Sequence, residues 1–370
     1  MRAEDHRNRI ARAMASIFAA GFLLLAGAVP GSRAWAAEKR VIRVAAVGDV
    51  MMGTEGRLPP DDGLSLFAAA KPFLLPNDIV FCNHEGTLTH FDKPTKVPVD
   101  TIAYVFRTPP RYARYLEEAG FNMVSVANNH FHDYGAAGAQ ETMDVLRQHH
   151  IEFSGPPGII ARKTVNDLKT VMVAFHSSAN SHWLLDIPKA RQIVQQLAKS
   201  NDIVIVSFHG GQEGREALHT PREMEFHLGE PRGEIVRFAR AVVEAGADLV
   251  LGHGPHVPRA MEIYRGRLIA YSLGNFCTGE GINVQGETGY APLLLAELDE
   301  NGQLLGGRIV SFYQTYGQPP VLDPQNRAGR LMHRLGCLDF PDSNAMTEDG
   351  GLIPATNQER QVPAETASTE

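Results

Sequence analysis

The sequence predicts a layered α/β fold, and three observations support this prediction. Apolar runs rich in β-branched residues alternate with amphipathic helical stretches along most of the 370 residues. The apolar runs lack a strict period of two, as expected for strands that are covered on both faces. With 44% hydrophobic residues, the chain can also bury a sizeable core. Strands alternating with helices are typical of sheets that carry helices on their faces.

Both halves of the chain repeat a pattern of strand, polar loop and helix. Gly120 and Gly246 each close an expected helix. In the first half we expect strand 40–50, strand 78–82, helix 110–120, strand 121–130, helix 138–149 and strand 151–155. In the second half we expect strand 170–177, helix 187–200, strand 201–211, helix 233–246, strand 247–256 and strand 267–276. We assign all of them to a single domain, residues 37–340.

The N-terminal segment has the layout of a secretory signal peptide. Four arginines precede an apolar run at 15–31, and Ala34-Trp35-Ala36 supplies a small-residue cleavage signal. The alternative is an uncleaved membrane anchor, although the run is shorter than the roughly 20 residues that span a bilayer. We expect residues 1–36 to be removed on export to the periplasm or the cell exterior, which changes the formal net charge from -7 to -10.

Composition limits the remaining possibilities. Residues 341–370 are polar with almost no aromatic residues, so we expect a disordered tail there. The negative net charge does not favour nucleic acid as a partner. Three cysteines, Cys82, Cys277 and Cys337, are too few for a disulfide framework or a thiolate zinc site, although one disulfide stays open.

Five polar motifs follow the expected strands, and they carry the functional prediction. They are VGDVMMG (47–53), FCNHEGTLT (81–89), VANNHFHDYGAAG (126–138), SFHGGQE (207–213) and GHGPHVP (252–258). The candidate metal ligands in them are Asp49, Glu85, Asn129, His209, His253 and His256. Oxygen and imidazole donors suit borderline and hard divalent metals. The motifs therefore predict one or two divalent ions of Mn, Zn, Fe or Mg, among which the ligand types do not distinguish.

Each motif also has a purely structural interpretation. Asp49 fits a turn, Asn129 fits a helix cap, and a histidine such as His209 after an apolar strand often packs in the core. GHGPH is the most specific motif, because glycine and proline hold His253 and His256 in one constrained loop. Five such motifs in series favour a hydrolytic metal site over a set of caps and turns.

Further candidates surround the metal ligands. His130 is a candidate general acid, and Asp133 would fix the tautomer of an imidazole. Asn83, Glu213 and Asn275 are candidate substrate-binding residues. Two irregular stretches, 89–108 and 211–232, follow motif residues directly and would contact substrate, since function concentrates in long loops on a rigid scaffold.

In order and spelling, these motifs resemble the CapA family of poly-γ-glutamate capsule biosynthesis proteins, whose domain belongs to the calcineurin-like metallophosphoesterase superfamily. The resemblance covers roughly residues 42–316, and AGADLVLGHGPHVPRAMEIYRGRLIAYSLGNF is its most specific part. It implies a four-layered α/β/β/α sandwich with the site at the carboxyl ends of the strands. It also implies a first-motif ligand at Asp49, a bridging carboxylate at Glu85, the Asn-His pair at Asn129 and His130, and later ligands at His209, His253 and His256.

The sequence departs from the family pattern at four positions. The second motif is built on Glu85 instead of the superfamily's usual paired-Asp arrangement. Met51 stands where the superfamily usually has the histidine of D-x-H, so one ligand of the first metal is missing. Gly254 and Gly211 stand where the CapA pattern leads us to expect a histidine and an aromatic residue. We expect these two losses to widen the pocket.

The resemblance implies an exported, metal-dependent hydrolase-type protein associated with capsule or poly-γ-glutamate biosynthesis. Its substrate would be an anionic phosphoester or γ-glutamyl compound, attacked by a metal-activated water. The alternative is a noncatalytic accessory that binds and helps export or anchor an acidic capsule polymer, within a capsule-synthesis membrane complex. The basic residues Arg259, Arg265 and Arg267 would supply positive potential for that role. Fold alone does not decide between them.

Overall fold

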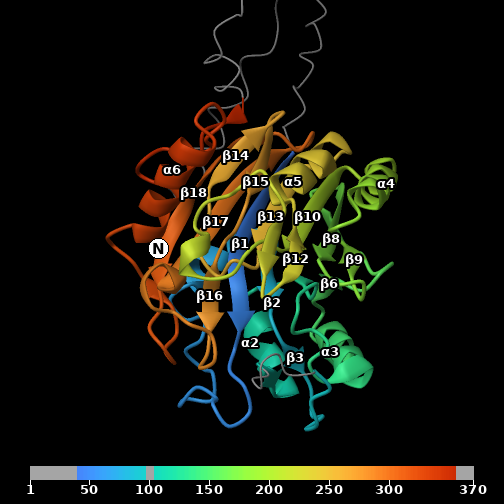
Figure 1. Cartoon of the computed structure of the whole chain (residues 1–370), viewed down its shortest axis with the longest axis vertical. Coiled ribbons are helices and arrows are strands. Elements are labelled where there is room, and N and C mark those ends of the chain that lie inside the picture. Colours follow the sequence, from blue (N-terminus) through green and yellow to red (C-terminus); the bar gives the residue numbers. More distant parts are fainter. Residues whose placement is uncertain (1–39, 97–103, 356–370) are drawn as a thin grey trace, which may run out of the picture. The chain divides into compact units, whose positions relative to one another are not determined.

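Two β-sheets stacked face to face form the centre of the fold (Figure 1). The computed structural model describes residues 40–96 and 104–355, so the expected signal segment 1–36 lies outside the described residues. The first sheet has the order β19 (Val321–Leu322), β18 (Leu304–Tyr313), β17 (Tyr290–Asp299), β1 (Val41–Met51), β2 (Ile79–His84), β5 (Met123–Ser125) and β6 (Glu152–Ser154), and β16 (Asn275–Thr278) also pairs with β1. The second has the order β14 (Met261–Tyr264), β15 (Arg267–Ala270), β13 (Leu249–His253), β10 (Ile203–His209), β8 (Leu168–His176) and β7 (Ala161–Val165), and β9 (His182–Trp183) also pairs with β8.

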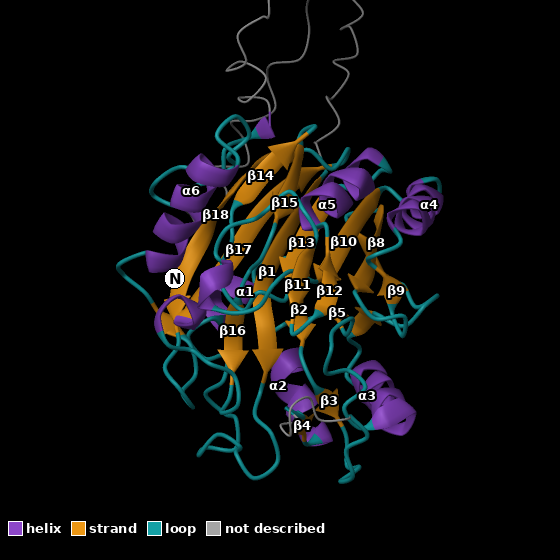
Figure 2. Cartoon of the chain, in the orientation of Figure 1, coloured by secondary structure: helices purple, strands orange, loops and turns teal. Residues whose placement is uncertain are grey.

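Helices cover the outer faces of both sheets (Figure 2). The described helices are α1 (Lys71–Leu74), α2 (Ala113–Glu118), α3 (Gly135–Gln148), α4 (Ile187–Ala198), α5 (Ile235–Glu244) and α6 (Arg327–Asp339). Leu74, Leu116 and Leu146 of the first three pack on the first sheet, in one apolar cluster with its strands. Val194 of α4 and Val242 of α5 pack on the second sheet in the same way.

Alternation along the central strands explains why both faces of each sheet are buried. In β1, Val44 and Ala46 point between the sheets, while Ala45 and Val47 point to the helices. In β10, the odd-numbered Ile203 and Ile205 point inward, and the even-numbered residues between and after them face α4 and α5. The predicted four-layered α/β/β/α sandwich is confirmed, and so is the inference that both sheet faces are covered.

Most expected elements agree with the structure to within three residues. The expected strand 121–130 is reduced to β5 (Met123–Ser125), and a second exception is more informative. Segment 267–276 was expected to be one strand, but it forms β15 in the second sheet and β16 in the first. The chain crosses from one sheet to the other between them, at Tyr271–Gly274. Because β16 runs parallel to β1, this crossing brings Asn275 into register with Asp49.

The C-terminal part of the fold corrects the expected tail. Segment 341–355 pairs with the sheets through bridges from Asn344 to Glu262 and from Gly351 to Arg308. Met346 and Leu352 are buried and join the apolar layer between the sheets. The expectation of disorder is therefore wrong for 341–355, because a few apolar side chains in a polar sequence suffice to cover the sandwich next to α6. Residues 356–370 lie outside the described residues.

Smaller features complete the scaffold. β3 (Thr87–Leu88) pairs with β4 (Arg107–Thr108) across the first stretch expected to be irregular, and β11 (Glu225–His227) pairs with β12 (Glu230–Gly233) near the end of the second. Cys82, Cys277 and Cys337 are free thiols. Across 40–96 and 104–355, no helix has both the length and the apolar content to cross a membrane.

Candidate metal centre

The candidate site lies where the parallel strands of both sheets end. In Figure 1 the arrowheads of β1 and β16 point to the end of the molecule where α2 and α3 lie. Asp49 of β1 lies in register with Asn83 of β2. In the second sheet, His209 of β10 lies in register with His253 of β13. Since the carboxyl ends of parallel strands meet at one edge, two strand-end positions on each sheet face the same place.

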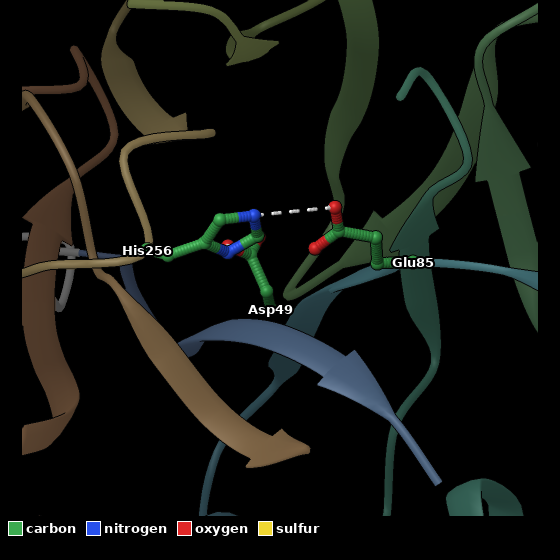
Figure 3. Close-up of side chains that lie close together, drawn as sticks. All are labelled: Asp49, Glu85 and His256. Carbon is green, nitrogen blue, oxygen red and sulfur yellow. Dashed lines mark ion pairs between the residues drawn. The ribbon is translucent and has the colours of Figure 1, made fainter. Parts of the chain in front are cut away.

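Asp49, Glu85 and His256 form the centre of this site (Figure 3). Nδ1 of His256 lies 3.1 Å from Oδ2 of Asp49, and Nε2 lies 3.6 Å from Oε1 of Glu85. One potential ligand atom from each residue falls within 4.8 Å of the others. Both carboxylates are completely buried. A buried pair of carboxylates needs a cation between them, and these three residues have the donors to hold a divalent one.

Three other expected ligands surround this centre. Nε2 of His209 lies 3.9 Å from Oε1 of Glu85, and Nδ1 of His253 lies 3.3 Å from Oδ1 of Asp49. Asn129 lies in the loop after β5, beside His130, whose Nε2 is 4.0 Å from the same Oε1 of Glu85. The structure thus brings all six candidate metal ligands to one end of the sandwich.

Unpartnered polar atoms test whether these residues fit a metal. Buried atoms of this kind normally have hydrogen-bond partners. Within the described residues, the following have none: Oε1 and Oε2 of Glu85, Oδ1 of Asn129, Nε2 of His209 and Nε2 of His253. They are oxygen and imidazole donors from both sheets, the chemistry that a divalent cation satisfies. The residues present therefore fit a metal ion.

Electrostatics of the metal-free centre support the same conclusion. Burial, partly offset by the charge of His256, raises the pKa of Glu85 to about 8. Burial also lowers the pKa of His256, but Glu85 and Asp49 outweigh it and raise that pKa to about 10. Burial would raise the pKa of Asp49, yet its contacts with His253 and His256 hold it well below the usual value. A proton on His256 supplies the positive charge that the buried Asp49 carboxylate requires.

His256 is also held in an unusual backbone conformation. Its φ of 57° lies in the left-handed region, which costs a non-glycine residue of order 1 kcal/mol or more. Asn275 stabilises this position, because its Oδ1 accepts from Nδ1 of His256 at 3.0 Å and its Nδ2 donates to the His256 carbonyl at 3.2 Å. Strain of this kind clusters at functional sites.

His130 and Asp133 lie at the edge of the metal centre. Nδ1 of His130 donates to Oδ2 of Asp133 at 2.8 Å, since a carboxylate only accepts, and Nε2 is left facing Glu85. Burial lowers the pKa of His130, and Asp133 opposes that effect. The ring of Phe106 stacks on His130 with centroids 4.1 Å apart, which covers one face of the imidazole. Asp133 is therefore a positioning residue for His130.

The three expected substrate-binding residues have different surroundings. Asn83 donates through Nδ2 to Oδ1 of Asp49 at 2.8 Å, and the same atom lies 3.2 Å from Nδ1 of His209. Asn275 also donates to the carbonyls of residues 283 and 288. Both amides are thus engaged by protein groups and position ligands instead of facing a substrate. Glu213 lies closer to solvent, with Oε2 3.8 Å from Nε2 of His256.

The sequence reasoning missed three residues of the site. Lys96 lies 3.2 Å from Oδ1 of Asp133, Arg232 lies 2.9 Å from Oε1 of Glu213, and His176 of β8 is in register with His209. His176 had the same signal as His209, a histidine ending an apolar strand. Lys96 and Arg232 had none, because both lie in polar stretches with several similar charged residues.

The departures from the family pattern have structural explanations. The side chain of Met51 packs with Phe106 and Ile282 in a small apolar cluster. The expected widening of the pocket is wrong at Gly254, which has a φ of +115°: a Cβ there would lie 2.5 Å from the carbonyl oxygen of Gly210. Backbone of the neighbouring loop therefore fills the space that a side chain would need.

The expected basic cluster does not form. Arg259 is completely buried and ion-paired with Glu225, while Arg265 lies 3.7 Å from Glu244. Arg267 pairs with Asp248 at 3.3 Å. Each arginine has its own carboxylate, so these three residues do not present a common surface to an acidic polymer.

The chain is similar in sequence and in fold to several known proteins. The CapA capsule biosynthesis protein of Bacillus anthracis is 26% identical over 269 residues, covering 66% of this chain and 61% of that protein. A probable polyglutamine synthesis accessory protein of Mycobacterium tuberculosis is 29% identical over 225 residues, covering 54% of this chain and 55% of that protein. A solved structure, a putative 5'-nucleotidase from Staphylococcus aureus in complex with alpha-ketoglutarate, covers 80% of this chain and 58% of that chain, at 14% identity and a TM-score of 0.45.

The chain spans about three fifths of the length of the CapA protein it matches. A family model described as bacterial capsule synthesis protein PGA_cap matches residues 43–280, which contain every candidate site residue. Because the match extends over more than half of the sequence, the chain belongs to the PGA_cap family of bacterial capsule synthesis proteins, and the resemblance to CapA is confirmed.

Proposed function

We propose that this chain is a metal-dependent hydrolase of capsule or poly-γ-glutamate biosynthesis, which acts on an anionic phosphoester or γ-glutamyl substrate. One observation carries the proposal: unpartnered buried donors from both sheets converge beside a buried carboxylate pair. A turn or a helix cap would leave these atoms with protein partners. Family membership and the name of the CapA relative support the biosynthetic context.

The residues divide into two ligand sets. Glu85, Asn129, His209 and His253 would hold one ion, and Asp49, Glu85 and His256 a second one. A divalent cation bound there lowers the pKa of a water and polarises the substrate oxygen. Asn83 and Asn275 keep the ligands in place through the contacts to Asp49, His209 and His256.

His130 would transfer the proton that the leaving group needs. Asp133 holds its Nδ1 proton, so Nε2 faces the centre and carries the transferable proton when the ring is charged. Lys96 lies 3.2 Å from the second oxygen of Asp133, and its Nζ donates to the carbonyl of Asn129 at 3.2 Å. Phe106 shields the imidazole from water on one face.

Metal analysis combined with a substrate panel tests this function. The full chain is purified, loaded with Mn, Zn, Fe or Mg, and assayed on phosphodiesters, phosphomonoesters and γ-glutamyl peptides. We expect bound metal and metal-dependent turnover of one substrate class, both lost in His253→Ala and both kept in His219→Ala, whose side chain is 65% exposed. If the wild type binds no metal and His253→Ala leaves its stability unchanged, the assignment of a metal site is refuted.

One observation favours a second function, a noncatalytic accessory that binds an acidic capsule polymer. Met51 replaces a ligand of the first metal and packs in an apolar cluster, so the first ligand set is the thinner one. The name of the Mycobacterium tuberculosis relative also contains the word accessory. Metal binding and polymer binding without turnover of any class in the panel would establish this alternative.

Export and membrane association belong to the proposal as well. The N-terminal pattern supports cleavage after Ala36, with an acidic mature protein in the periplasm or outside the cell, where it would act with the capsule-synthesis membrane complex. Mass spectrometry of the protein from fractionated cells tests this. A mature N-terminus at Ala37 in the soluble exported fraction is the expected result, and an intact N-terminus in the membrane fraction would show an anchor.

A further inference from the structure

Arg232 is a buried cation with incomplete partners. Its side chain is 3% exposed and lies on β12, in the stretch that follows His209. Nη2 comes within 2.9 Å of Oε1 of Glu213 without the alignment of a hydrogen bond. Nε finds no acceptor among the described residues. Burying a guanidinium in this way costs free energy, because its donors have lost their water.

Arg259 shows how the same region satisfies an arginine that has a structural role. Its Nε donates to the carbonyl of Ala217 at 2.7 Å, and Nη1 and Nη2 donate to the two oxygens of Glu225 at 2.9 and 2.7 Å. Arg259 is thus fully engaged by the protein. Arg232, which is equally buried in the same loop system, has free donors, and this difference indicates a ligand.

The backbone holds Arg232 next to the metal centre. Its carbonyl accepts from the N–H of Gly211 at 3.0 Å. A Cβ on Gly210 would lie 2.7 Å from that carbonyl oxygen, so the close approach requires a glycine directly after His209. The two glycines of SFHGGQE therefore serve to bring β12 against the end of β10.

Glu213 connects Arg232 to the metal ligands. It lies 2.9 Å from Arg232 through Oε1 and 3.8 Å from Nε2 of His256 through Oε2. Burial lowers the pKa of His209, and the positive charge of Arg232 lowers it further. An anion that displaced Glu213 from the guanidinium would lie beside the Asp49–Glu85–His256 centre.

We propose that Arg232 is a substrate-binding residue whose guanidinium receives an oxoanion group of the substrate, a carboxylate or a phosphoryl group, in exchange for Glu213. The planar guanidinium presents paired donors that match two oxygens of such a group. This inference rests on the proposed function, because it names the substrate group that the same site selects. It assigns Glu213 the role of an internal competitor instead of a substrate ligand.

Anion titrations of variants test the inference without turnover. Inorganic phosphate and acetate are titrated into the full chain, metal-free and Mn-loaded, by calorimetry. We expect Arg232→Gln to weaken binding of at least one anion about tenfold or more, with unchanged Mn content. Arg232→Lys keeps the charge but loses the paired donors, so its anion affinity should lie between those of the wild type and Arg232→Gln. Glu213→Gln should tighten binding several-fold, because the competing carboxylate is removed.

Matched controls come from Arg237 on α5 and Glu234, the residue that precedes this helix. Arg237, with its side chain 71% exposed, pairs with Glu234 at 2.6 Å, so Arg237→Gln and Glu234→Gln remove a similar ion pair away from the centre and should leave both affinities unchanged. If Arg232→Gln weakens the binding of phosphate alone, the substrate group is a phosphoryl group. If it weakens the binding of acetate alone, the group is a carboxylate.

Two results would overturn the inference. The first is an Arg232→Gln variant that binds anions as tightly as the wild type. The second is a Glu213→Gln variant that binds anions more weakly, as expected if Arg232 and Glu213 form a purely structural ion pair. Arg232-dependent anion binding in a protein that binds no metal would refute the proposed function and leave the inference standing. Metal-dependent turnover with unchanged kinetics in Arg232→Gln would support the proposed function and refute the inference.

Discussion

The imidazole of His130 donates to the carboxylate of Asp133 over 2.8 Å, three residues further along the same loop. This contact fixes the tautomer of the imidazole, and it raises the pKa of a ring that burial lowers. Asp133 is thus a positioning residue, and replacing it should alter His130 while leaving the metal ligands in place.

Asp133→Asn is expected to lower kcat about 100-fold, in line with what general acid catalysis contributes, with Mn content unchanged. NMR titration should also show a lower pKa for His130, a result that does not depend on turnover. Asp144→Asn on α3, where the side chain is half exposed, serves as control. An unchanged His130 titration in Asp133→Asn would contradict the assigned role.

Loss of His209 or His253 should remove the metal. Each supplies a buried Nε2 without a hydrogen-bond partner, and the alanine variant removes that donor. We expect His209→Ala and His253→Ala to retain less than about a tenth of the Mn bound by the wild type, and to lose the rise in melting temperature that added Mn produces. His219→Ala should behave as the wild type. Equal Mn content in all four proteins would argue against the ligand assignment.

The raised pKa values of Glu85 and His256 predict how the stability of the metal-free protein depends on pH. Both groups hold a proton more tightly in the folded chain than at their ordinary values of 4.5 and 6.5. Their contribution is fully present below those values and is lost as pH rises through about 8 for Glu85 and about 10 for His256. We expect the free energy of unfolding, measured in urea, to fall between pH 6.5 and 8.

Glu85→Gln should reduce this slope, because glutamine imitates the protonated carboxyl and does not titrate. Saturating Mn should reverse the trend, since metal binding displaces protons and strengthens as pH rises. A metal-free wild type that gains stability from pH 6.5 to 8 would show that these two groups do not control the dependence.

The C-terminal segment should contribute measurably to stability. Leu352 is 6% exposed and packs in the layer between the sheets, so Leu352→Ala is expected to cost about 2–5 kcal/mol. Leu338→Ala on α6, where the side chain is 63% exposed, should change stability by less than about 0.5 kcal/mol. Urea denaturation of both variants measures the difference. Equal effects would mean that segment 341–355 is not part of the folded core.

The ligand positions were predictable because a local sequence pattern marks each of them. Asp49 lies two residues before the end of the apolar strand β1, and His209 ends the apolar strand β10. Such a strand places a polar residue near its carboxyl end at the edge of the sheet. The sequence did not reveal which strands share a sheet, so it could not show that the crossing between β15 and β16 would place Asn275 against His256. That contact depends on pairing between segments far apart in the chain.

Arg232 illustrates what sequence patterns leave out. It follows several similar charged residues in the stretch 211–232, and nothing in that stretch separates it from Arg215 or Arg222. Its burial results from the contact of its carbonyl with Gly210 and Gly211, which is a property of packing. The C-terminal segment was missed for a related reason, since its apolar residues are too few to form a periodic pattern.

The centre takes Asp49 and Glu85 from the first sheet and His209 and His253 from the second. Neither half of the chain has a complete ligand set, so a metal ion can be captured only after the two sheets have packed. An ion held there would join the two sheets and would slow their separation. A substitution in the apolar layer between them, at Phe81 for example, should therefore weaken metal affinity without altering any ligand.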